Sequence, residues 1–196
     1  MVNKNNLNSS NIQIFVDLDG VVANWEKRAI EVLGMDFEST KNILKTGVDL
    51  EDICEVHPWE ILDKKHNEFW NELELFPWAY QMIEKLCEFG EVSFLSSGGN
   101  IYRRPEGVGN AGLGKTMWVS DKFKNYQIPL ILTKHKYFCA GPNSILIDDT
   151  AKKIDEFTRY GGHGFLFPHP YKILDGDLKF NDVLGELETK IMLIDK

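Results

Sequence analysis

The chain has 196 residues, of which 43% are hydrophobic and 27% charged, and its formal net charge is −8. This composition is typical of a folded globular protein and excludes disorder throughout, and the length suits one domain that carries a sizeable insertion. The net negative charge argues against capture of nucleic-acid polymers, because that affinity comes from neutralising many phosphates. A small anionic substrate is compatible with it.

The N-terminal residues 1–10 are polar and rich in Asn, without the apolar centre of a signal peptide, so we predict a flexible N-terminus there. No stretch approaches the roughly 18 apolar residues of a membrane span. The three cysteines are widely spaced and include no C-x-x-C pair, which is typical of thiols in a reducing compartment. We therefore predict a cytoplasmic protein that does not contact membranes.

The first predicted strand, residues 12–16, is apolar and ends at two carboxylates, Asp17 and Asp19. Ionised groups leave water only when they are paired or bound to metal, so we expect a cation at this strand end. An EF-hand loop is excluded, because Val21 and Arg28 stand where it needs oxygen ligands. A polar turn without function and a Mg²⁺ site at the end of a parallel strand are the two interpretations that remain.

The next segment has little strand character. Asn24 is expected to cap a helix that Gly34 ends, since its apolar positions follow a 3.6-residue period. Short helical patterns follow at residues 40–45, 50–54, 59–62 and 66–73. We predict a small helical cap at residues 25–76, with many aromatic side chains.

An alternation of helices and strands then resumes. Strands are predicted at residues 91–95, 129–132, 144–147 and 164–167, and helices at 77–90, 115–125, 150–160 and from about 181. Residues 100–114 are rich in Gly and Arg with little periodicity, so we expect a surface loop. The predicted fold class is α/β, with a Rossmann-like core of residues 11–24 and 77–196 around a parallel sheet.

Four of the predicted strands end in polar side chains. They are Asp17 and Asp19, Ser96 and Ser97, Lys134, His135 and Lys136, and Asp148 and Asp149. In a parallel sheet with right-handed crossovers these four ends lie at one edge. Carboxylates from two strands can hold Mg²⁺, another can attack phosphorus, and a hydroxyl and an ammonium can bind phosphoryl oxygens. The set favours the hydrolysis of phosphate monoesters.

The D-L-D-G-V segment at 17–21, a strand-end Ser, a strand-end Lys and Asp148-Asp149, in that order, resemble the four motifs of the haloacid dehalogenase superfamily of phosphotransferases. A narrower resemblance is to the 5′(3′)-deoxyribonucleotidase family. It rests on D-x-D-G-V-x-A-x-aromatic, the cap after the first strand, K-x-x-W-V at 115–119, L-T-x-x-K at 132–136 and L-I-D-D.

This resemblance implies a role for each residue near the reacting phosphate. Asp17 would be the nucleophile and a metal ligand. Asp19 would protonate the leaving alkoxide and then act as base for water, with its backbone carbonyl facing Mg²⁺. Ser96 would hydrogen-bond the phosphoryl oxygens, Lys136 would neutralise the intermediate, and Lys115 would be a second phosphate contact.

The resemblance also implies that Asp148 and Asp149 complete the Mg²⁺ site, and it leaves open which of them binds the metal directly. Ser97 would contact the substrate. Three aromatic side chains would line the nucleoside pocket: Trp25, Phe69 and Trp70.

The chain departs from the family pattern at two strand ends. Ser96-Ser97-Gly98-Gly99 stands where Thr-Ser-Pro is expected, and a longer loop follows, from which Arg103 or Arg104 would add a phosphate contact. Lys134 and His135 replace the Arg and Asp expected before Lys136. Substrate preference is therefore the weakest part of the inference.

Several of these residues also have a structural explanation. The Asp148-Asp149 pair suits a helix N-cap, and each of the aromatic residues suits a hydrophobic core. The following histidines lack metal-ligand spacing and receive no role: His57, His66, His163 and His169.

Together the observations predict a Mg²⁺-dependent phosphatase. Its substrate would be a (deoxy)ribonucleoside monophosphate, which it would split into nucleoside and phosphate through an aspartyl-phosphate. One alternative keeps the chemistry and takes sugar phosphates or other small phosphomonoesters. Another is a non-catalytic, phosphate-sensing binding module similar to a receiver domain. The apolar positions expected on the cap fit either a homodimer surface or a lid.

Overall fold

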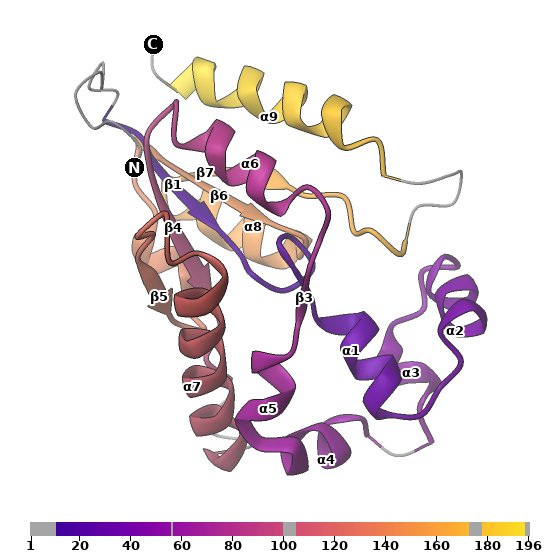
Figure 1. Cartoon of the computed structure of the whole chain (residues 1–196). Coiled ribbons are helices and arrows are strands. Elements are labelled where there is room, and N and C mark those ends of the chain that lie inside the picture. The colour runs from indigo at the N-terminus through magenta and orange to yellow at the C-terminus, as the bar shows by residue number, and fades with distance from the viewer. Residues whose placement is uncertain (1–10, 56, 100–104, 173–177, 195–196) are drawn as a thin grey trace.

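The computed structural model describes residues 11–55, 57–99, 105–172 and 178–194. Its centre is a five-stranded parallel sheet in the order β5-β4-β1-β6-β7 (Figure 1). The strands are β1 (Gln13–Val16), β4 (Glu91–Ser96), β5 (Leu130–Leu132), β6 (Ser144–Asp148) and β7 (His163–Leu166). The predicted parallel α/β sheet is therefore confirmed.

Strand β1 is the middle strand and pairs with β4 on one side and β6 on the other. Its apolar run has the composition of a strand buried on both faces. Ile14 and Val16 belong to the large hydrophobic cluster that includes Met82. Phe15 points to the other face, where it packs with Phe157. This alternation fixes the strand in register and brings Asp17 to the centre of the sheet's carboxyl edge.

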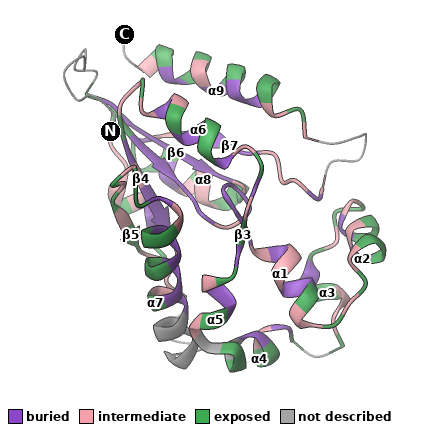
Figure 2. Ribbon diagram, viewed as in Figure 1, coloured by how far each residue is buried: buried purple, intermediate pink, exposed green. Residues whose placement is uncertain are grey.

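Helices cover both faces of the sheet. Helices α6 (Ala79–Leu86) and α9 (Phe180–Ile194) contribute to the larger cluster, and α8 (Ala151–Arg159) packs on the opposite face. Figure 2 shows the central strands β4, β1 and β6 as the most continuously buried part of the sheet, with exposed residues on the outer sides of the helices. None of the described helices is both long and apolar enough to cross a membrane.

The segment between β1 and α6 is helical, as predicted. It contains α1 (Trp25–Val32), α2 (Phe37–Leu44), α3 (Leu50–Ile53), α4 (Trp59–Leu62), a 3₁₀ turn (Asp63–Lys65) and α5 (His66–Asn71). Asn24 caps α1 by accepting a hydrogen bond from the backbone of Lys27. Figure 1 shows these helices to one side of the sheet.

Two short strands, β2 (Ala23–Asn24) and β3 (Glu74–Leu75), pair in antiparallel fashion at the base of the insertion. The sequence did not indicate them, because two residues are too few to show a period-2 pattern. They bring the start and the end of the insertion together. The assignment of residues 25–76 as a separate cap stays a prediction, since α1 shares the large hydrophobic cluster with the sheet.

The prediction of a surface loop at residues 100–114 is wrong from Pro105 onward. Helix α7 (Pro105–Lys122) begins there, and proline suits a first helical turn. Glycines lower helix propensity, but a Cβ added at Gly114 would lie 2.5 Å from Cβ of Trp70. The small residue thus permits close packing of α7 against α5. The remainder of the expected loop, with Arg103 and Arg104, lies outside the described residues.

Candidate active site

Three carboxylates meet at the carboxyl edge of the sheet. One oxygen from each of Asp17, Asp148 and Asp149 lies within 4.8 Å of the others. The cluster follows from the topology, because β1 and β6 are parallel neighbours with Val16 opposite Ile147. Asp148 and Asp149 both belong to the cluster, so the structure leaves open which of the two binds a metal directly.

Lys136 is the cation buried within this cluster. It lies in a 3₁₀ turn (Lys136–Cys139) after β5, and its Nζ is 2.8 Å from Asp17 Oδ1 and 2.6 Å from Asp148 Oδ2. Burial opposes its charge, but the carboxylates of Asp17 and Asp148 outweigh this effect and raise the pKa of the ammonium. Lys136 is therefore held charged between the two strand ends.

The two oxygens of Asp17 differ in their surroundings. Oδ1 accepts a hydrogen bond from the backbone N–H of Leu18 at 2.8 Å and pairs with Lys136. Oδ2 has no hydrogen-bond or ion-pair partner among the described residues. One oxygen is thus fixed in place, and the other is free to bind a metal or to react.

Asp149 lies against the turn that follows β1. Gly20 has φ +75°, and a Cβ added there would lie 2.0 Å from Asp149 Oδ2. Burial raises the pKa of Asp149 to about 7, and the nearby charge of Asp17 adds to this effect. The cluster is short of positive charge, with three carboxylates and one ammonium. A divalent cation with oxygen ligands fits this donor set.

A second ion pair lies beside the cluster. Buried Lys115, on α7, places its Nζ 2.5 Å from Asp19 Oδ2 and 3.0 Å from both Ser96 Oγ and the carbonyl oxygen of Ser97. Asp19 Oδ1 is buried without a hydrogen-bond partner among the described residues. Burial raises the pKa of Asp19 although Lys115 opposes it, so this carboxyl is suited to carry a proton.

A row of tryptophans leads from the insertion to Lys115. Trp25 stacks on Trp59 with ring centroids 5.9 Å apart, and Trp59 stacks on Trp70 at 6.0 Å. The Trp70 ring centroid lies 4.6 Å from Nζ of Lys115. Phe69 and Trp70 are only 1% and 7% exposed and pack edge-on against each other, so both offer a ligand little surface, whereas Trp25 and Trp59 are half-buried. Trp59, which the sequence did not single out, is part of this row.

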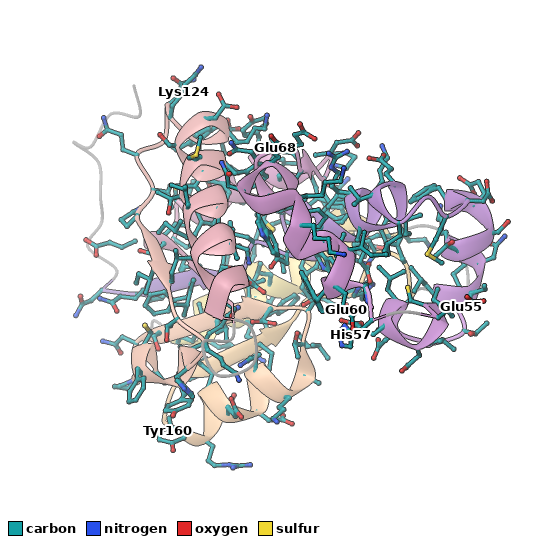
Figure 3. The ribbon with its side chains drawn as sticks, turned by 90° about the horizontal axis from the view of Figure 1, so that it is seen from below. Glu55, His57, Glu60, Glu68, Lys124 and Tyr160 are labelled. Carbon is teal, nitrogen blue, oxygen red and sulfur yellow. The ribbon has the colours of Figure 1, made fainter. Side chains whose placement is uncertain are left out.

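His169 is a further residue of the site that the sequence analysis missed. Its Nε2 is 3.1 Å from Glu26 Oε2 and 3.7 Å from Asp149 Oδ2. His57, by contrast, is exposed and lies with Glu55 and Glu60 on the insertion (Figure 3). No spacing in the sequence separates a histidine of the site from a surface one.

The structure thus brings most of the predicted site residues together in two neighbouring groups. Lys136 and the carboxylates of Asp17, Asp148 and Asp149 form one group, and Lys115 with Asp19, Ser96 and Ser97 forms the other. Two of them, Asp19 and Ser97, do not lie as the sequence analysis most simply predicts. The side chain of Asp19 pairs with Lys115 and is not among the three clustered carboxylates, and Ser97 takes part through its carbonyl oxygen.

Residues 10–191 match the model of a protein family described as 5′ nucleotidase, deoxy (pyrimidine), cytosolic type C protein (NT5C). The chain belongs to this family. It is a phosphoric monoester hydrolase of the 5′-nucleotidase type. No curated protein matches this chain significantly.

Solved structures show the same fold at low sequence identity. A predicted phosphatase from Clostridium acetobutylicum is 12% identical with a TM-score of 0.53, over 93% of this chain and 98% of that one. A haloacid dehalogenase-like hydrolase from Xanthomonas campestris is 11% identical with a TM-score of 0.50, over 93% of each chain.

Proposed function

We propose that this NT5C-family phosphatase hydrolyses (deoxy)ribonucleoside monophosphates to nucleoside and inorganic phosphate through an aspartyl-phosphate on Asp17. The observation that carries the proposal is the contrast between two neighbouring carboxyls. Asp17 has a free oxygen beside a buried ammonium, whereas Asp19 has a raised pKa and one unpartnered oxygen. Two environments of this kind suit a nucleophile and a general acid.

In the first step Oδ2 of Asp17 attacks phosphorus, and the bond from phosphorus to the nucleoside oxygen breaks. The proton of Asp19 passes to that oxygen, so a neutral nucleoside leaves. Lys136 and the hydroxyl of Ser96 bind the phosphoryl oxygens, on which charge is spread in the transition state. The products of this step are the nucleoside, phospho-Asp17 and ionised Asp19.

In the second step ionised Asp19 takes a proton from water. The water oxygen attacks phosphorus, the Asp17 carboxylate leaves, and phosphate is released while Asp19 is protonated again. Lys115, 2.5 Å from Asp19 Oδ2, stabilises the charge that Asp19 carries between the two steps.

Mg²⁺ is the cofactor we propose, held by the side chains of Asp17, Asp148 and Asp149, with the backbone carbonyl of Asp19 as a further ligand. When bound, the ion would offset the charge of the carboxylates and of the phosphoryl group. The shortage of positive charge in the cluster and the raised pKa of Asp149 support this assignment.

The tryptophan row supports a nucleoside as the leaving group. Aromatic faces stack with bases, and Trp70 connects the insertion to Lys115 and so to the proposed general acid. The family description names deoxy pyrimidine nucleotidases, which puts deoxyribonucleotides first among the substrates. The same description and the free thiols of all three cysteines support the cytoplasm as the compartment.

The experiment that tests this proposal is phosphate release from matched deoxyribo- and ribonucleoside monophosphates and from sugar phosphates, with Mg²⁺ and with EDTA. Metal-dependent turnover confined to nucleotides is the expected result. Equal activity on sugar phosphates would keep the Asp17 chemistry and remove the nucleoside assignment. Binding of phosphate without turnover of any substrate would favour the non-catalytic module.

A further inference from the structure

A buried acidic side chain outside the carboxylate cluster calls for an explanation. Glu26, in the first turn of α1, is only 6% exposed. A buried carboxylate is costly unless it is paired. Its partner among the described residues is His169, whose Nε2 lies 3.1 Å from Glu26 Oε2. None of the proposed catalytic steps uses either residue.

The contacts of His169 define which ring nitrogen carries hydrogen. The backbone N–H of Tyr171 donates to Nδ1 at 3.3 Å, so Nδ1 acts as an acceptor and Nε2 carries the hydrogen. This Nε2 faces Glu26 and also lies 3.7 Å from Asp149 Oδ2. One ring N–H therefore stands between a carboxylate of the cluster and a carboxylate of the helical insertion.

The segment that carries His169 is itself fixed to the insertion. The Tyr171 hydroxyl and the Asn24 side-chain amide hydrogen-bond each other, at 2.7 and 3.0 Å, and both residues are buried. The Tyr171 ring packs edge-on against Phe37, and Lys172 pairs with Asp49. These contacts limit the movement of the imidazole toward or away from the cluster.

We infer that His169 is a positioning residue that holds the carboxylate of Asp149 in the metal-binding cluster, with Glu26 holding His169 in turn. Asp149 is confined on one side by Gly20 and faces His169 through the same oxygen, Oδ2. Its other oxygen accepts a hydrogen bond from Thr150 Oγ1 at 3.2 Å. Residues that orient metal ligands in this way commonly change metal affinity about 10- to 100-fold when they are replaced.

The inference rests on the cluster being the Mg²⁺ site of the proposed function, and its test measures metal binding without substrate. Mg²⁺ is titrated calorimetrically into the metal-free wild type and into His169→Ala and His169→Gln. His169→Ala is expected to bind Mg²⁺ about 10- to 100-fold more weakly. His169→Gln should recover most of the affinity, because its amide nitrogen can replace the Nε2 hydrogen-bond donor.

Two further measurements separate positioning from a merely structural role. Phosphatase activity of His169→Ala should fall at low Mg²⁺ and return at saturating Mg²⁺. The Mg²⁺ concentration required for half-maximal activity should therefore rise, while kcat at saturating Mg²⁺ stays unchanged. Glu26→Gln, which is nearly isosteric, should shift the requirement in the same direction by a smaller factor. The matched control is His163→Gln, since His163 contacts the Pro142 carbonyl away from the cluster.

Wild-type Mg²⁺ affinity in His169→Ala, or tighter binding, would overturn the inference. So would weak binding in His169→Gln equal to that in His169→Ala. Failure of the nucleotidase proposal would appear separately, as Mg²⁺ binding with the expected ranking of variants but no nucleotide turnover.

Discussion

Replacing Gly20 by Ala is expected to reduce Mg²⁺ affinity far more than it reduces stability. Gly20 has φ +75°, and its added Cβ would lie 2.0 Å from Oδ2 and 2.7 Å from Cγ of Asp149. Such distances cannot persist, but the atoms that must move belong to a side chain that can rotate. The clash is therefore relieved when the Asp149 side chain rotates out of the cluster, and this rotation weakens metal binding.

Gly34→Ala is the matched control. Gly34 has a similar φ of +69°, and nothing lies within 4 Å of the position of an added Cβ. A left-handed backbone conformation costs a non-glycine residue roughly 1–2 kcal/mol, so both variants should lose about that much stability. For a domain of this size the loss corresponds to a decrease in Tm of about 2–8 °C.

The assay compares thermal unfolding and calorimetric Mg²⁺ binding of the two variants with the wild type. The expected result is a similar fall in Tm for both, together with at least about a 10-fold loss of Mg²⁺ affinity in Gly20→Ala alone. Equal Mg²⁺ affinity in the two variants would refute the placement of Asp149 against the turn at Gly20.

Three further predictions concern the reaction, the pH dependence and the aromatic row. Asp17→Asn should abolish turnover while circular dichroism and Tm stay near wild type, and undiminished phosphate release would contradict the nucleophile assignment. Because burial raises the pKa of Asp149 from 3.8 to about 7, the native metal-free protein binds this proton more tightly than the unfolded chain. The free energy of unfolding of the metal-free wild type should therefore fall relative to that of Asp149→Asn between about pH 4 and 7, and urea titrations that show a constant difference would contradict this. Trp25→Leu should raise KM for nucleotides more than KM for glycerol phosphate, since Trp25 is the half-buried end of the tryptophan row, and equal changes in steady-state assays would remove its role toward the nucleoside.

The sequence was sufficient to predict the sheet and most of the polar network. Asp17 and Asp148 stand at the ends of apolar runs, and parallel strands place such ends at one edge whatever the details of packing. The contact of Lys136 with both of them follows from the same topology. Strand ends are therefore the part of this site that a pattern of residues can specify.

The remaining features depend on contacts between segments that share no pattern. His169 meets Glu26 only because the chain after β7 crosses the base of the insertion, and a single histidine has no periodicity to indicate this. The glycines of α7 resemble a loop by propensity, whereas their small size serves packing against Trp70. Periodicity also could not distinguish the core residue Phe69 from the stacked Trp59, because both are aromatic residues of the same helical segment.

The most direct test of the proposed function is a single-turnover reaction with a deoxyribonucleoside monophosphate that carries a radioactive phosphate, quenched in acid. We predict Mg²⁺-dependent label on the wild-type protein, located by mass spectrometry in the peptide that contains Asp17, and none on Asp17→Asn. Full turnover of the nucleotide with no protein-bound label at any quench time, or with label on another residue, would contradict an aspartyl-phosphate at Asp17.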